Sequence, residues 1–475
     1  MPSGGSLILA AISCALPAVA AAAERPRLTP TGLVHFRPER IDNLQDFDSD
    51  ADDDDFLFSL RGDAGLILDM ERDVRVKLTL NAADNYSLQK GPLDDTVRLH
   101  EAWFELQGLG GADFSIKIGR QSLGTLGTGM LLADEPFDPG LSFEAVRFSH
   151  QAGAFSSDFW WVQLYGWWDD AQAHPVLFGL WETWRQSEAF AVDAYLLLLL
   201  AQPVRGLSTD TITGGARWFG EVGGADYNLE LAYQWGRGIH EGDTLDDERV
   251  SAHAGELDLG YTFAGLGLAP RLGASVYRAS GDSDPEDDRI ETFNPLWQDE
   301  RGRLGNLGIL QGHNIQVIRP NLTLRLSAAT DLTLAGLMVS VVEVRDPATS
   351  VATPLVPKHH PHEEGDEGEQ EGGAADGDGD AGAGDAGAGR SMADMQVGGE
   401  ADGGAAGEVL VAGPKEAGAG TDVGLGGDIT LTYRYTKRVS FEVNASVLQP
   451  GDYIEANLGS RDLAMRVYVH CQAIF

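Results

Sequence analysis

Segments in which polar and apolar residues alternate recur along most of this chain, and they constrain its fold more than any other feature. In residues 56–69, Phe58, Leu60 and Leu66 share one parity, while Arg61 and Asp63 share the other. A β-strand points successive side chains to opposite faces, so such a segment indicates a strand with one apolar and one polar face. Roughly 17 segments of this kind can be identified. Those beyond residue 140 are 143–149, 158–167, 188–201, 211–219, 227–235, 252–263, 269–279, 314–327, 331–344, 427–435, 439–448 and 463–475.

The polar face of these strands carries charged residues repeatedly, which favours a barrel in lipid over a sandwich in water. A sandwich buries one face of each sheet against the other, whereas a barrel with a wet lumen gives inward charges a place to point. The cations on this face are Arg37, Arg61, Lys77, Lys117, Arg147, Arg217, Arg325, Arg434 and Arg466. We therefore predict an all-β, transmembrane, antiparallel β-barrel. Bacterial barrels close with an even number of strands, so 16 or 18 strands are implied, with 18 favoured.

Other features agree with a membrane barrel. No run of 18 apolar residues follows the first 23, so a membrane helix is not available, but a membrane strand needs only about 9 to 11 residues. Aromatic residues cluster towards strand ends, which suits the girdles at the two membrane surfaces; they are Trp160, Trp161, Trp167, Trp168, Trp181, Trp184, Tyr433 and Tyr435. The last segment, 463–475, alternates from Met465 to Gln472 and ends on Phe475, so it resembles the terminal strand by which outer-membrane barrels are recognised for insertion.

Both chain ends and the cysteine count fit export from the cytoplasm. Residues 1–23 read as a secretory signal peptide, with a lipid anchor on Cys14 as the less favoured alternative. Without the signal only Cys471 remains, so an intramolecular disulfide is excluded. We expect residues 24–475 to form a single barrel in the bacterial outer membrane. Residues 347–422, low in apolar content and rich in Gly, Ala, Asp and Glu, are predicted to be a disordered acidic loop between two strands.

The formal net charge of −39 excludes an electrostatic nucleic-acid binder, which needs clustered cations. The acid is concentrated in residues 46–55, 282–288 and 363–402. These acidic loops offer oxygen ligands for Ca²⁺, but residues 282–288 lack the EF-hand spacing. We therefore expect no resident cofactor or metal.

Three groups of motifs, in order along the chain, resemble the alginate export family of outer-membrane barrels. The first is GRQ at 119–121 with FEAVRF at 143–148, where the family usually has Asp at position 144. The second is ASGD at 279–282 with TFNPL at 292–296, and the third is QPGDYI at 449–454. The resemblance implies an 18-stranded pore that passes an anionic polysaccharide out of the cell. It also implies a strand after residue 345, where this chain instead has the acidic tract.

A polyuronate has one carboxylate on every sugar, so a conducting lumen should offer cations, with Arg favoured for its planar, always-charged fork. Parity assigns seven of them inward: Arg61, Lys77, Lys117, Arg147, Arg325, Arg434 and Arg466. The resemblance adds Arg120, whose parity points it at lipid; we expect a kink or bulge at Gly119 to turn it into the lumen. The competing interpretation is that these cations only pair with carboxylates across the wall, such as those of Asp63, Asp69, Glu101, Glu105 and Glu442.

The function expected is therefore export of an alginate-like polyuronate through an Arg- and Lys-lined lumen. The alternative is a porin for small solutes, general or anion-selective. Expected partners are the polysaccharide, outer-membrane lipid and periplasmic export components, and we expect a monomer. An outer-membrane enzyme is disfavoured, because no Ser, His and Asp arrangement stands out. A soluble carbohydrate-binding β-protein is a further, less favoured alternative.

Overall fold

A computed structural model of the chain describes residues 26–44, 47–50, 54–70, 73–89, 91–111, 113–134, 140–164, 175–204, 207–238, 248–298, 301–346 and 420–475. The signal peptide predicted at 1–23 lies outside these residues, as does the acidic loop predicted at 347–422 apart from its last three residues.

The described residues form β-strands almost throughout, as the alternating segments predict. The strands of the first half are β1 (Arg27–Asp42), β2 (Asp55–Met70), β3 (Val74–Ser87), β4 (Gly91–Leu106), β5 (Phe114–Gln121), β6 (Phe143–Ala152), β7 (Phe155–Gln163), β8 (Val176–Ser187) and β9 (Phe190–Val204). Those of the second half are β10 (Leu207–Val222), β11 (Ala225–Gly238), β12 (Glu248–Thr262), β13 (Arg271–Ala279), β14 (Arg289–Ile290), β15 (Ile315–Ser327), β16 (Thr330–Val341), β17 (Asp422–Arg434), β18 (Val439–Pro450) and β19 (Ala464–Ile474). Two short helical turns, η2 (Leu109–Gly111) and α2 (Asp452–Leu458), complete the elements. Within the described residues, no helix is both long and apolar enough to span a bilayer.

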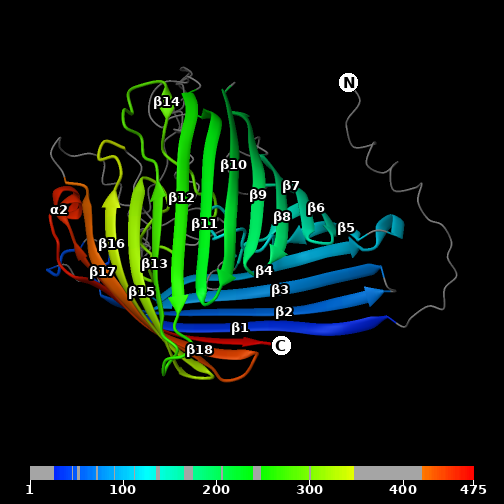
Figure 1. The fold of residues 1–475 in the computed structure, drawn as a ribbon, viewed down its shortest axis with the longest axis horizontal. Helices are drawn as coiled ribbons and strands as arrows, with labels where there is room; N and C mark the ends of the chain where they lie inside the picture. Colours follow the sequence, from blue (N-terminus) through cyan, green and yellow to red (C-terminus); the bar gives the residue numbers. More distant parts are fainter. Residues whose placement is uncertain are drawn as a thin grey trace, which may run out of the picture.

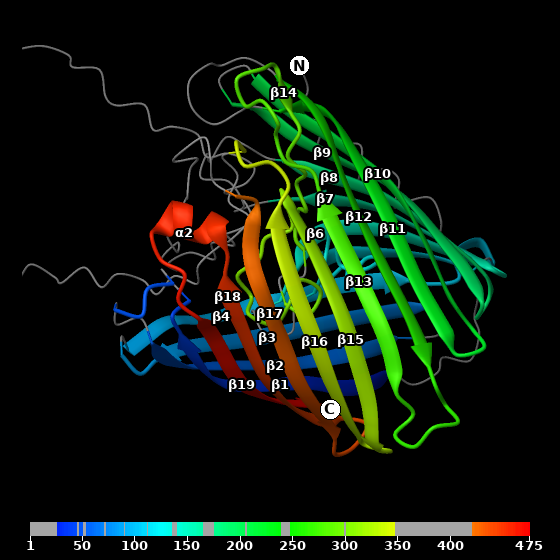
Figure 2. The ribbon, with the colours of Figure 1, turned by 60° about the vertical axis from the view of Figure 1, so that its left-hand side comes forward.

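The strands close into one antiparallel barrel (Figures 1 and 2). Each long strand pairs with its neighbour in the sequence, and β19 pairs with β1 to close the ring. The two-residue β14 pairs in parallel with the end of β12, so 18 strands make the wall. The predicted fold and strand number are confirmed. The wall has no gap at the acidic tract, because β17 pairs with both β16 and β18.

The two faces of the wall have the predicted character. In β2, Arg61 and Asp63 point inward, while the outward Leu60 and Leu66 are exposed. In β19, the inward Arg466 and His470 are buried, and the outward Val469 is exposed. Closed pairing leaves no free edge, so every strand can satisfy its backbone groups within the ring. The outer apolar surface is thus a continuous band made by one parity of each strand.

The aromatic girdle prediction holds only in part. Trp184 and Tyr433 lie on the outward face and are exposed, as a girdle requires. Trp160 and Trp181 instead point inward and are buried. The indole of Trp160 lies against Gly179 of the next strand, where a side chain would have filled its place. Residues 167 and 168 lie outside the described part of the chain.

The two ends of the barrel differ. At one end, here the short-turn end, connections such as 153–154 and 223–224 are tight turns. The long connections, 122–142, 280–314 and 342–421, all leave from the opposite, long-loop end. Phe475 lies at the short-turn end, where its backbone exchanges hydrogen bonds of 2.7 and 3.0 Å with Gly32.

Candidate functional site

The barrel interior is the candidate site, and two connections from the long-loop end fold into it. The structure describes them at residues 122–134, 140–142, 291–298 and 301–314, called here the two inner loops. They pair with each other through backbone hydrogen bonds, from the Ala133 N–H to the Trp297 carbonyl (2.7 Å) and from the Trp297 N–H to the Leu131 carbonyl (2.9 Å).

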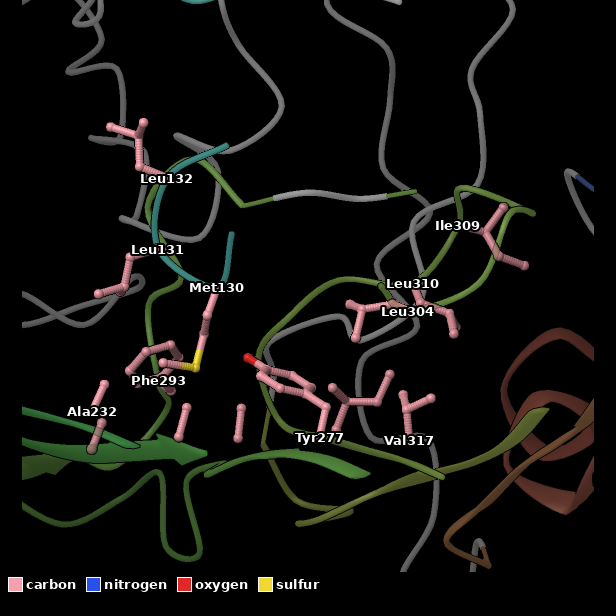
Figure 3. Packing of buried hydrophobic residues seen from close by; sticks show 14 of the residues in the cluster. Met130, Leu131, Leu132, Ala232, Tyr277, Phe293, Leu304, Ile309, Leu310 and Val317 are labelled. Atoms are coloured by element: carbon pink, nitrogen blue, oxygen red, sulfur yellow. The ribbon is translucent and has the colours of Figure 1, made fainter. Parts of the chain in front are cut away.

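Apolar residues of the two inner loops form a core within the barrel. Met130, Leu131, Phe293, Leu304 and Ile309 are all at most 1% exposed. Figure 3 shows the Met130 side chain directed towards Phe293, and Leu304 beside Leu310 on the side of Tyr277 and Val317 of the wall. Burial of this much apolar surface stabilises the loops against the wall by the hydrophobic effect. The long-loop half of the interior is therefore packed.

Polar contacts anchor the inner loops to inward residues all around the ring. The Thr128 N–H donates to Glu230 on β11 (2.7 Å), and the Asn306 N–H donates to Asp428 on β17 (3.3 Å). Each carboxylate lies near the middle of its strand, so the loops reach deep into the barrel. On other strands, Arg98, Tyr277, Arg319 and Arg466 donate to the carbonyls of Gly140, Gly312, Gly302 and Leu307, respectively.

In the short-turn half, three of the predicted lumen cations come together on the inner wall. Lys117 on β5 lies opposite Arg147 on β6, and Lys77 on β3 is close by. All three side chains are partly exposed. Arg147 pairs with Asp158 (2.8 Å) and Lys77 pairs with Glu101.

Lys117 differs from its two neighbours. Its ammonium lies 4.4 Å from the centre of the Trp103 ring, and among the described residues no carboxylate lies within ion-pair distance of it. The cation–π contact leaves the donors of the ammonium available to an anion. Lys117 is therefore the cation of this cluster that can bind an incoming carboxylate without first breaking an ion pair.

Four other predicted residues lie elsewhere. Arg325 and Arg434 share Asp331 at the short-turn end, at 3.7 and 2.6 Å, and both are well exposed there. Arg61 and Arg466 are buried near the inner loops. Arg61 pairs with Asp63 (2.8 Å), and Arg466 pairs with Glu39 on β1 (3.1 Å). These two arginines hold the wall and loops together rather than line open space.

The prediction that Arg120 enters the lumen was wrong. The expected irregularity exists, since Gly119 has a φ of 119°. The strand register nevertheless continues through it, so Arg120 lies opposite Ala102 and Glu144 on the outward parity. Its guanidinium lies 3.9 Å from the Glu144 carboxylate and donates to Ser142 (3.2 Å) at the long-loop rim. The kink changes one backbone conformation without shifting the pairing by a residue, and only such a shift reverses a side chain.

Sequence reasoning missed several inward ion pairs. Arg271 binds both Asp226 and Asp258, at 2.5 and 2.8 Å. Arg303, from an inner loop, pairs with Glu256 (3.3 Å). Arg271 lies within the predicted segment 269–279, and its parity there already indicated an inward side chain. No pattern in residues 280–314 could have indicated the partner of Arg303.

The acidic loop at residues 282–288, considered above as a source of Ca²⁺ ligands, is held in part by a hydrogen bond to Asp346. Burial raises the pKa of the Asp282 carboxyl above its ordinary value, and the nearby Asp346 carboxylate acts in the same direction. Asp346 accepts hydrogen bonds from the Asp282 N–H (2.8 Å) and the Thr292 hydroxyl (2.5 Å). In the described part of the chain, no group of three or more His, Cys, Asp or Glu residues is arranged to hold a metal ion.

Comparison with known proteins gives one family and one fold. The model of a family described as alginate export matches residues 44–339. Among solved structures, the fold is similar to OpdL of Pseudomonas aeruginosa (9% identity, 95% of this chain and 99% of that one, TM-score 0.52) and to OccAB2 of Acinetobacter baumannii (8%, 94% and 98%, 0.52). It is also similar to OccK5 (OpdH) of Pseudomonas aeruginosa (10%, 94% and 98%, 0.51). No curated protein matches.

Proposed function

We propose that this chain, which belongs to the alginate export family and is a channel of the bacterial outer membrane, exports an anionic polysaccharide of the polyuronate type. The observation that carries the proposal is the partly exposed cluster of Lys77, Lys117 and Arg147 on the inner wall. Within it, Lys117 has no carboxylate partner among the described residues.

The cluster suits a moving polyanion because its binding would be weak and repeated. A conduit must bind strongly enough to admit its cargo and weakly enough to release it. Cations already paired with wall carboxylates, such as Arg147 with Asp158, offer only their remaining donors to a passing uronate. Lys117 would bind a uronate carboxylate more strongly than its paired neighbours do, but at a single position. Export also requires the two inner loops to shift, because they fill the long-loop half of the barrel.

The same loops favour a second candidate, an anion-selective porin for small solutes. Packed inner loops restrict the passage, and a restricted passage admits small anions without any displacement of the loops. Both functions share the barrel and the cationic cluster. They differ in whether the cargo is a polymer.

Single-channel recording in planar bilayers tests the proposal. We expect the wild-type channel to prefer anions and to be blocked by uronate oligomers added on the short-turn side. The Lys117→Gln variant should require several-fold more oligomer for half block, because it loses the ammonium of the cluster that has no carboxylate partner among the described residues. Lys437→Gln is the matched control; it removes the same charge from the turn between β17 and β18, outside the lumen, and should block as wild type.

Three results would contradict polysaccharide export. Cation preference without oligomer block excludes a polyanion conduit. Small-anion current with no block supports the porin instead. Equal block of the Lys117→Gln variant, the control and the wild type would show that the cluster does not bind the cargo.

A further inference from the structure

Three arginines at the long-loop end of the barrel face outward, away from the lumen. On β13, Arg278 lies opposite Gly255, one residue from the inward and buried Tyr277. Arg249 on β12 and Arg289 on β14 lie side by side in the pairing register. Their neighbours Val250 and Ile290 have the opposite parity and point inward, against Gly238. All three arginines are exposed.

Among the described residues, these three arginines have no counter-charge. No carboxylate of the described residues lies within ion-pair distance of Arg249, Arg278 or Arg289, in contrast to Arg61, Arg147 or Arg466 on the inner wall. The one side-chain hydrogen bond of the set joins Arg278 to the Gln316 amide oxygen (3.2 Å).

A fourth cation adds to the charge, because Arg237 on β11 lies directly opposite Arg249. Positive charge therefore gathers on this outer surface, and such a surface attracts a negatively charged ligand.

Towards the short-turn end from these arginines, the outward face of the wall is apolar. An aromatic pair lies where this apolar surface ends. On β12, Tyr261, Leu259 and Leu257 face outward near the short-turn end, and the same face turns polar at His253 and then Arg249. On β11, the stacked rings of Tyr233 and Trp235 lie 6.0 Å apart. Aromatic side chains of this kind sit at the headgroup level of a membrane barrel. The unpaired arginines therefore lie at the depth of lipid phosphates.

We propose that this outer surface, formed by Arg249, Arg278, Arg289, His253 and Gln316, binds the phosphate of an outer-membrane lipid headgroup. Arginine binds phosphate through two parallel N–H donors, and this geometry suits cations that project sideways from a wall into the headgroup layer. The ligand is a membrane lipid rather than the transported polymer, because these side chains project outside the ring, beside the apolar band. The inference does not depend on the cargo of the pore.

Native mass spectrometry of the detergent-purified full chain tests the site. The probes are a glucosamine-disaccharide lipid with two phosphates and the same lipid after enzymatic removal of both. We expect wild type to bind the phosphorylated lipid about tenfold more tightly than the dephosphorylated one, and less tightly as salt rises. The triple variant Arg249→Gln, Arg278→Gln, Arg289→Gln should lose about that tenfold preference.

The matched control is Arg40→Gln with Arg120→Gln. Both arginines are also at the long-loop end, but each already lies near a carboxylate, Arg40 near that of Asp54 (3.4 Å) and Arg120 near that of Glu144. The control should bind the phosphorylated lipid within about twofold of wild type. Retarded gel mobility after heating confirms that each variant is a folded barrel. If the triple variant does not fold, the single variant Arg278→Gln replaces it, and its affinity for the phosphorylated lipid should fall roughly threefold.

Two outcomes would overturn the proposal. Equal affinity of wild type for the phosphorylated and dephosphorylated lipids would show that phosphate is not recognised. Wild-type lipid affinity in the triple variant, together with loss of binding to soluble uronate oligomers, would assign the arginines to the transported polymer.

Discussion

Loosening the core of the inner loops should open the channel. Leu304 is completely buried within this core and belongs to no wall strand. Truncation to Ala removes three carbon atoms and leaves a cavity, which costs about 2–5 kcal/mol in well-packed sites. Because the barrel is held by strand pairing that excludes Leu304, this cost should fall on loop docking rather than on the barrel.

The expected size of the effect follows from a two-state equilibrium of the loops. A loss of about 3 kcal/mol changes the ratio of docked to undocked loops by roughly 150-fold. If the undocked state is populated at about 0.1% in the wild type, the Leu304→Ala variant should populate it at about 13%. Single-channel recordings should then show bursts of higher conductance that occupy on the order of a tenth of the open time.

Leu425→Ala is the control. It removes the same atoms from an outward leucine of β17 that is 60% exposed, so it should leave the conductance unchanged. Heat-modifiable gel mobility should show that both variants remain folded barrels. A folded Leu304→Ala channel whose conductance trace matches wild type would refute the idea that packing of this core closes the long-loop half.

Three further substitutions test separate parts of the structure. Gly119→Ala should lower the free energy of unfolding in urea by about 1–3 kcal/mol, because φ is 119° there and a Cβ would contact a backbone carbonyl of β4 too closely. The control is Gly62→Ala, whose Cβ would meet nothing within 4 Å, and it should lower the free energy of unfolding by less than half as much. Equal losses of free energy in the two variants would contradict this explanation. In the wild type, the raised pKa of Asp282 means that its loop is most stable below the ordinary pKa of 3.8 and loses stability as the pH rises through the folded-state pKa. Asp282→Asn should abolish this pH dependence of the protection of the loop from proteolysis. Limited proteolysis of wild type that does not increase over this range would contradict that sign. Arg120→Gln should leave anion selectivity unchanged, because the side chain faces outward. A loss of selectivity would show that this side chain lines the pore.

The resemblance and the residue pattern disagreed at one position, and the pattern was the better guide. Parity placed Arg120 outward, and the family likeness placed it inward. A strand keeps its pairing unless a residue is inserted, and here the kink at Gly119 inserts none. For the other seven cations, parity gave the right face, since alternation is a local property that needs no knowledge of the partner strand.

Exposure of these cations could not be foreseen in the same way. Lys117 and Arg61 have the same pattern around them, yet Lys117 stands partly exposed against Trp103 while Arg61 is buried beside Gly140. The difference arises from the inner loops, which cover one half of the wall. Nor did the pattern indicate that Trp160 and Trp181 would turn inward, because girdle and core positions look alike in sequence.

The sequence by itself determined the class of fold, the strand number within one choice, the closing strand just before the last residue and the face of the cations assigned by parity. These follow from a period of two residues and from the need of a membrane barrel to close with its backbone satisfied. The tertiary structure alone decided where the two inner loops pack, which carboxylate each arginine meets and which arginines of the outer wall meet none among the described residues. Those contacts join residues far apart in the chain, such as Arg466 with Glu39, and no local pattern records which distant strand or loop will arrive opposite a given side chain.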